Sequence, residues 1–294
     1  MEWQRGRRSS NIEDRRGMGG VGGGGMRMGR VAGGGGIGII VVALIAMFLG
    51  VDPSIILQGG GGGLMPMDQP GSSSQLEPAK EGELKDFVSV VLADTEDTWT
   101  PIFQQLGRQY EEPPLVLFSG AVQSACGMAG SATGPFYCPG DHKVYLDLSF
   151  FDELDRQFGA PGDFAQAYVV AHEVGHHVQN LLGILPKVDQ YRRQADETAA
   201  NHASVLLELQ ADCFAGVWAN HAQRARQVLQ QGDLEEGLNA ASKIGDDRMQ
   251  QRAGRYVNPE SFTHGSSEQR VRWFRTGLQT GQLEACDTFN AANP

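Results

Sequence analysis

The stretch that decides the fold is DFAQAYVVAHEVGHHVQNLLG, residues 163–183. Asp163 followed by Gln166 is a helix N-terminal signature, and Gly183 is typical of a helix stop. No proline interrupts the stretch, and most of its positions are apolar. The sequence therefore predicts a single helix of about twenty residues whose few polar side chains would be buried and would need partners.

The predicted helix contains HEVGH at residues 172–176. Residues four apart face the same side of a helix, so His172 and His176 can reach one metal ion. Glu173 would stand beside that ion, available to a water molecule rather than to the metal. Neutral imidazoles suit Zn²⁺, and a catalytic zinc has three protein ligands and one position open for water. The motif therefore predicts a zinc site with Glu173 as general base.

The third ligand must come from another segment. The longer pattern HExxHxxGxxH is not completed, because Gln179 stands at the glycine position and Leu182 at the third histidine position. Residues 201–222, NHASVLLELQADCFAGVWANHA, again have a helical pattern. This second helix is where we look for the missing ligand.

Glu208 and Asp212 are the only acids in the second helix, and they lie one turn apart among apolar neighbours. Acids on an apolar helix are seldom buried without a cation or a donor. We therefore expect Glu208 to bind zinc and Asp212 to accept a hydrogen bond from a ligand histidine. His202 is the rival third ligand, and His177 is a lesser one.

These residues carry a resemblance to known proteins. HEVGH together with ELQAD at 208–212 resembles the gluzincin metallopeptidases, which pair HExxH with a downstream ExxxD. The surrounding sequence, including LELQADCFAGVWA and THGSSEQRVRWF, resembles the bacterial putative neutral zinc metallopeptidase family. Members of that family are membrane-anchored at the N-terminus. The resemblance covers about residues 80–290. It implies a zincin-like core in which His172, His176 and Glu208 bind Zn²⁺ and Glu173 is the base.

The expected fold class is α+β, a helix-rich zincin-like domain with a small antiparallel sheet. A zincin fold implies an edge strand that binds extended peptide, and the candidate is the hairpin of Pro135–Cys138 and Lys143–Leu148. His264, just before a helix that opens with Ser266 and Gln269, is the candidate donor to the oxyanion. Other expected elements are a strand near 115–118 and helices over 233–244 and 268–278.

The charge distribution divides the chain. Residues 1–30 hold seven Arg and three acids, a balance of +4, so residues 31–294 sum to −15 because the whole chain is −11. Such an acidic body lacks the basic footprint of a nucleic-acid-binding protein. Residues 31–51, VAGGGGIGIIVVALIAMFLGV, are 21 residues without a charge. A helix of that length would span about 31 Å, close to the thickness of a bilayer.

This pattern predicts a single-pass protein of the cell membrane. The arginine excess before the apolar run predicts that the N-terminus is cytoplasmic and that the catalytic domain is exported. The Gly-rich and Ser-rich sequence before Glu83 is typical of a flexible linker. The first helix of the domain should run from Leu84 to a break at Pro101. The expected organisation is a disordered basic arm, a transmembrane signal-anchor, a linker and a metallopeptidase domain (1–30, 31–52, 53–82 and 83–294).

The four cysteines agree with export. No CxxC pair is formed by the cysteines, which stand at Cys126, Cys138, Cys213 and Cys286. Disulfides are common in an oxidising compartment. Of the three possible connectivities, the simplest joins Cys126 to Cys138 and Cys213 to Cys286.

The resulting hypothesis is a membrane-anchored zinc metallopeptidase acting on peptides or proteins. Glu173 favours it over an alternative, a membrane-tethered zinc-binding module that recruits a partner without cleaving it. A third reading, a structural envelope protein with a chance motif, predicts that no zinc is bound. Nothing in the sequence indicates an oligomeric state.

Overall fold

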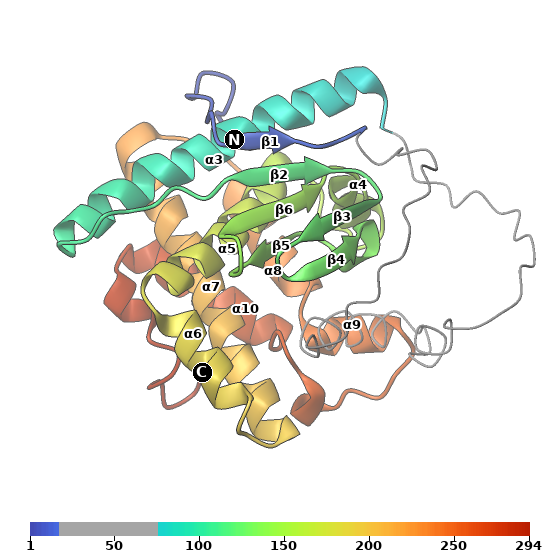
Figure 1. Cartoon of the computed structure of the whole chain (residues 1–294), viewed down its shortest axis with the longest axis vertical. Helices are drawn as coiled ribbons and strands as arrows, with labels where there is room; N and C mark the ends of the chain where they lie inside the picture. The colour runs from blue at the N-terminus through green and yellow to red at the C-terminus, as the bar shows by residue number, and fades with distance from the viewer. Residues whose placement is uncertain (18–75) are drawn as a thin grey trace, which may run out of the picture.

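Two short apolar runs form the centre of a four-stranded sheet. The computed structural model, which describes residues 1–17 and 76–294, orders this sheet β1-β2-β6-β5, and β3 and β4 form a separate hairpin (Figure 1). All four side chains of β2 are buried, as is typical of a central parallel strand. The strands are β1 (Ile12–Asp14), β2 (Leu115–Phe118), β3 (Ala121–Ser124), β4 (Gly127–Gly130), β5 (Phe136–Cys138) and β6 (Lys143–Asp147).

The pairing within the main sheet differs from the antiparallel arrangement that the sequence predicts. β1, β2 and β6 run parallel, and only β5 is antiparallel to its neighbour. The predicted hairpin of β5 and β6 is confirmed, with Tyr137 opposite Val144. Parallel neighbours need long connections between the paired strands, so pairing of β1 with β2 leaves no local signal in the sequence.

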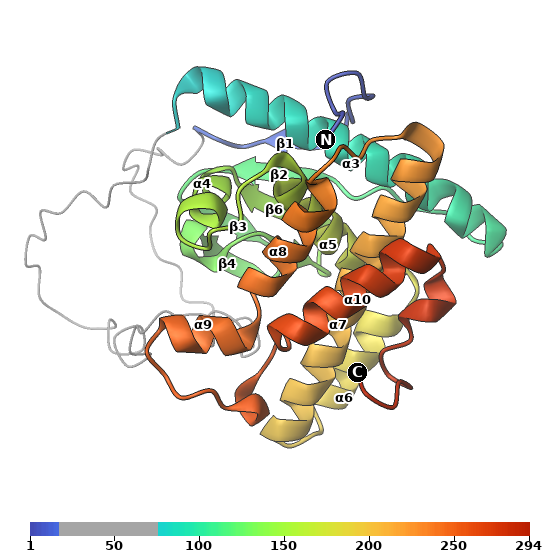
Figure 2. The same cartoon turned by 180° about the vertical axis from the view of Figure 1, so that it is seen from behind.

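Helices surround the sheet and form the larger part of the domain (Figure 2). α5 lies between the sheet and α7, because it contacts β5 and β6 as well as α7. α10 packs along α7 and also contacts α8. The helices are α3 (Pro78–Gln105), α4 (Ser149–Arg156), α5 (Asp163–Leu181), α6 (Ile184–Arg192), α7 (Glu197–Arg226), α8 (Asp233–Lys243), α9 (Asp246–Arg252) and α10 (Ser267–Thr280). Short 3-10 turns cover Ser131–Thr133, Pro259–Ser261 and Leu283–Cys286.

The helix ends agree with the sequence in most places. α5 is a single helix that ends next to Gly183, and α10 opens with a capping box in which Ser266 and Gln269 bond each other's backbone amides. Asp163 was expected to cap α5. It is instead the first helical residue, and Gly162 precedes it. Its carboxylate accepts a hydrogen bond from the amino group of Met1 at 2.6 Å.

The first long helix differs from the expectation at both ends. α3 begins at Pro78, inside the segment predicted as linker, and it continues through Pro101 to Gln105. Proline in a helix interior removes one hydrogen bond and favours a kink or a break. Ile102 and Phe103 are both buried, and this burial keeps the last turn in place.

Residues 1–17 were expected to have no fold, and that expectation is wrong. They supply β1 and pack along α3, with the Trp3 ring edge-on to Phe87 at 5.4 Å. Arg8 forms a two-pronged ion pair with Asp86 of α3. An arginine-rich composition is typical of disorder when it stands alone, but here the acidic body supplies the partners.

The expectations for the rest of the N-terminal third lie outside the described residues. These are the remainder of the arm, the membrane span at 31–52 and most of the linker. Among the helices of residues 1–17 and 76–294, none combines the length and apolar character needed to cross a bilayer.

The simplest of the possible disulfide pairings is the one that the structure contains. Cys126–Cys138 ties the β3–β4 turn to the end of β5, and Cys213–Cys286 ties α7 to the C-terminal tail. All four cysteines are therefore paired. Both cross-links hold segments that flank α5.

α7 and α10 cross with their backbones in contact. A Cβ atom added at Gly277 would lie 1.9 Å from the carbonyl oxygen of Cys213, and one added at Gly216 would lie 2.1 Å from that of Phe274. Only glycine allows this approach at either position. The close crossing brings α10, with the loop before it, against the middle of α7.

Gly277→Ala is expected to lower the free energy of unfolding by about 3 kcal/mol, because the new methyl group would force α7 and α10 apart. The matched control is Gly82→Ala in α3, where an added Cβ has nothing within 4 Å. This control should raise stability by about 0.5 kcal/mol through helix propensity. Chemical denaturation measures both changes, and equal effects of the two substitutions would show that the crossing is not tightly packed.

Candidate metal centre

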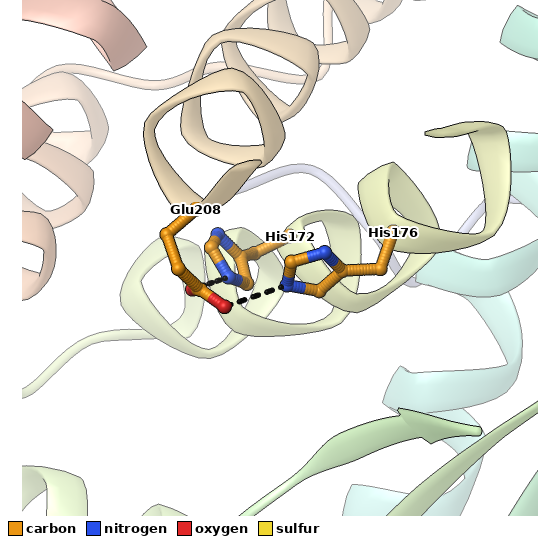
Figure 3. Close-up of side chains that lie close together, drawn as sticks. All are labelled: His172, His176 and Glu208. Carbon is orange, nitrogen blue, oxygen red and sulfur yellow. Dashed lines mark hydrogen bonds and ion pairs between the residues drawn. The ribbon is translucent and has the colours of Figure 1, made fainter. Parts of the chain in front are cut away.

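The two histidines of α5 and one glutamate of α7 meet at a single point. His172 Nε2 lies 3.1 Å from Glu208 Oε2, and His176 Nε2 lies 3.4 Å from Glu208 Oε1. One ligand atom from each residue falls within 4.8 Å of the other two. Figure 3 shows Glu208 reaching from α7 to the two rings on α5. The structure thus brings together the three residues that the sequence singles out.

The second nitrogen of each imidazole is already occupied. His172 Nδ1 lies 2.8 Å from Asp212 Oδ1, and His176 Nδ1 lies 2.8 Å from Gln179 Oε1. An oxygen acceptor at Nδ1 places the ring proton there and leaves the Nε2 lone pair free. Both Nε2 atoms face Glu208, so the two rings are oriented for one cation.

Asp212 is fully buried beneath this cluster. Besides His172, it accepts hydrogen bonds from Tyr168 Oη and from Arg270, whose Nε and Nη2 atoms lie 2.8 and 2.9 Å from the two carboxylate oxygens. Burial alone would raise the pKa of Asp212, but the charges of Arg270 and His172 lower it to about 2. The carboxylate is therefore ionised throughout the neutral range and can hold His172 in one orientation.

The charges of the cluster favour a cation at this place. Burial would lower the pKa of His172, but the carboxylates of Asp212 and Glu208 outweigh it and raise that pKa to about 10. The pKa of Glu208 is held well below its usual range by the two histidines, although burial opposes this. A proton on His172 meets this demand, and a divalent metal ion would displace it. Two imidazoles and a carboxylate are the ligand set of one class of catalytic zinc.

Glu173 lies next to the cluster and is only 8 % exposed. Burial raises the pKa of its carboxyl group, and the charges of His172 and His176 work in the opposite direction. A carboxylate in such a site is a stronger base than one in water. Its carboxyl group is therefore close enough to both histidines for their charges to affect its pKa.

The loop that carries His264 is built around a buried carboxylate. One oxygen of Asp246 accepts the backbone N–H groups of residues 263–265, and the other lies 3.2 Å from His264 Nδ1. Burial would lower the pKa of His264, but Asp246 and the nearby Glu208 raise it. A Cβ at Gly265 would lie 3.1 Å from Leu209. The loop therefore packs on α7 beside Glu208.

The two rival ligands are not part of the cluster. His177 is buried on another face of α5, where its Nε2 bonds the Glu111 carbonyl at 2.6 Å and its Nδ1 lies 3.0 Å from Tyr137 Oη. Burial lowers the pKa of His177 to about 4, so the ring is neutral at pH 7. His202 is exposed. It lines a cavity of about 510 Å³ together with Val205, which lies one turn before Glu208.

Sequence reasoning missed several residues that hold the cluster in place. Two of them could have been found from helical spacing. Gln179 lies three residues after His176, and Tyr168 lies four residues before His172, so both are on the same face of α5 as the histidines. Gln179 also donates to the Leu207 carbonyl of α7 at 2.7 Å. No local pattern in the sequence places Arg270 at the site, because it reaches the site from a helix about 100 residues further along the chain.

Relatives of the chain extend over nearly its full length. It is 49% identical over 292 residues to the "Uncharacterized protein YpfJ" of Escherichia coli K12, covering 98% of this chain and 99% of that one. It is 43% identical over 259 residues to the "Uncharacterized protein Rv2575" of Mycobacterium tuberculosis H37Rv, covering 84% and 86%. Comparison with solved structures gives no match. The family model described as "Putative neutral zinc metallopeptidase" matches residues 1–289, and the chain therefore belongs to that family.

Proposed function

We propose that the protein is a zinc-dependent metallopeptidase that hydrolyses peptide bonds. His172, His176 and Glu208 would be the three zinc ligands. One observation carries the proposal: the Nε2 atoms of both histidines converge on Glu208, while oxygen acceptors occupy both Nδ1 atoms. Membership of a zinc metallopeptidase family supports the same choice of metal.

The chemistry follows from the groups around the cluster. Zinc bound there would lower the pKa of a water molecule to about 7 and polarise the scissile carbonyl. Glu173 takes the proton of the attacking water and passes it to the leaving amine. The raised pKa of His264 favours the imidazolium form, which donates from Nδ1 to Asp246 and from Nε2 to the developing oxyanion.

The edge of the main sheet suits an extended peptide. β5 is the last strand of the sheet, and α5, which carries the histidines, contacts it directly. Tyr137 fixes the two elements to each other, since its hydroxyl bonds His177 and Asn180 of α5. A substrate strand added to β5 would be aligned along the helix that bears the cluster.

We further propose that the enzyme works at a membrane and in an oxidising compartment. Two disulfides support export, because such bonds seldom persist in the cytosol. The uncharged run at 31–51 supports attachment to the membrane.

Glu208→Ala should lower the zinc content of the purified protein, because the cluster loses its only carboxylate ligand. His202→Ala is the matched control, since His202 is exposed on the same helix and lies outside the cluster. Elemental analysis after dialysis compares the two variants with the parent. Full occupancy in Glu208→Ala together with loss in His202→Ala would transfer the ligand role to His202.

Glu173→Gln should reduce hydrolysis of a mixed peptide library by at least about 10³-fold, because an amide cannot accept the proton of the attacking water. Zinc content should stay at the parent level, and a chelator should abolish the parent's activity. Unchanged turnover in the variant would remove Glu173 from the role of base. A zinc-loaded parent that cleaves nothing would instead favour the partner-binding module.

His264→Ala should lower kcat by about 10²-fold with a smaller effect on KM, as expected for a donor that bonds the substrate oxygen only when charge develops on it. Zinc content should be unchanged, because His264 is not in the ligand cluster. Steady-state kinetics on one library-derived peptide separates the two constants. A loss confined to KM would assign His264 to ground-state binding.

A further inference from the structure

The N-terminal segment, residues 1–17, is built into the same domain as the metal centre. Its strand β1 pairs in register with β2, so that Ile12 lies opposite Leu115. The ladder is continued at both ends, by the Leu115 amide to the Asn11 carbonyl and by the Arg15 amide to the Leu117 carbonyl, each at 2.8 Å. Without this segment, β2 would be an open edge of a parallel sheet.

A buried carboxylate of α3 depends on the same segment. Glu96 is 1 % exposed, and within the described part of the chain its hydrogen-bond donors are Arg7, Ser9 and Asn11. Buried acids are rarely left without donors. Within the described residues, all the hydrogen bonds that the Glu96 carboxylate accepts therefore come from the N-terminal segment.

Apolar packing agrees with the polar contacts. Met1 and Trp3 are 5 % and 9 % exposed and belong to the main hydrophobic core. The backbone at Gly6 approaches α3 so closely that an added Cβ would lie 2.4 Å from a methyl group of Val90. Such contacts are those of a core element rather than of an arm lying on a surface.

The segment leaves the domain at the place where the chain returns to it. Arg16 Nη1 lies 3.7 Å from Glu81 Oε2 in the first turn of α3, and Lys85 forms an ion pair with Asp14 at 2.9 Å. Figures 1 and 2 both show the coil that follows β1 running to the start of α3. Residues 17 and 76 therefore mark two neighbouring points at one end of the domain.

We propose that residues 1–17 and the candidate metal centre lie on the same side of the membrane to which we propose the chain is attached. A single crossing between residues 17 and 76 would put the two on opposite sides and would forbid every contact described above. Two crossings would need about 40 apolar residues, whereas the uncharged run has 21. The contacts of residues 1–17 with the rest of the domain therefore require that the two lie on one side.

This topology replaces the cytoplasmic N-terminus that the arginine excess predicts. That rule counts Lys and Arg in short loops within about 15–20 residues of a membrane span. In the structure the arginines at positions 7, 8, 15 and 16 are each within 2.9 Å of a carboxylate. The pairs are Arg7–Glu96, Arg8–Asp86, Arg15–Glu13 and Arg16–Asp14. Their charges are used inside the domain and are largely neutralised there.

The first test is labelling of the full-length chain in intact cells. Ser10→Cys and Tyr256→Cys each place one thiol at an exposed position, in the N-terminal segment and in the C-terminal half, and all native cysteines are paired. A membrane-impermeant maleimide should label both variants or neither, and detergent should make both reactive. The unsubstituted chain is the blank. Labelling of one variant alone in intact cells would overturn the proposal.

The second test asks whether the packing exists in the membrane-bound protein. Arg8→Glu and Asp86→Arg each reverse one member of an ion pair that joins residues 1–17 to α3. In membranes, each single reversal should lower the melting temperature, and the double reversal should recover most of the loss. Additive or absent effects would show that residue 8 does not contact residue 86 there and would overturn the proposal. Neither test depends on the proposed peptidase activity.

Discussion

One buried carboxylate connects the helices on which the candidate metal centre depends. Asp212 of α7 bonds His172 and Tyr168 of α5 and Arg270 of α10. A buried anion is stable only when its donors are in place, so the three helices must meet in one arrangement. That arrangement also fixes the tautomer of His172. The geometry of the ligand atoms is therefore a consequence of how α5, α7 and α10 pack.

Close packing supports the same arrangement from outside the cluster. Gly216 and Gly277 let α7 and α10 touch at their backbones, and the disulfide at Cys213 fixes the C-terminal tail to α7 one residue after Asp212. The second histidine of the cluster, His176, is held in a similar way, because Gln179 links it to the backbone of α7. Each ligand histidine is thus held by a partner that is itself held by a second helix, which limits the movement of both rings.

The N-terminal segment shows how charge complementarity can replace an apolar signal. Composition places residues 1–17 with disordered basic arms, and the structure places them in the sheet and in the core. The difference arises because their arginines meet the carboxylates of α3, about 80 residues away in the chain. A local reading of composition cannot include partners that only the fold brings near.

The sequence by itself determined the parts that depend on short spacing. Two histidines one turn apart, Glu208 and Asp212 at the same separation, and the cap at Ser266 are local patterns, and a helix fixes their relative directions. Only the tertiary structure decided the parallel pairing of β1 and β2 and the approach of Arg270. It likewise decided that Glu208, rather than His202, reaches the two rings. These outcomes join segments separated by tens of residues, and the free energy that selects them comes from burial and pairing in the assembled domain.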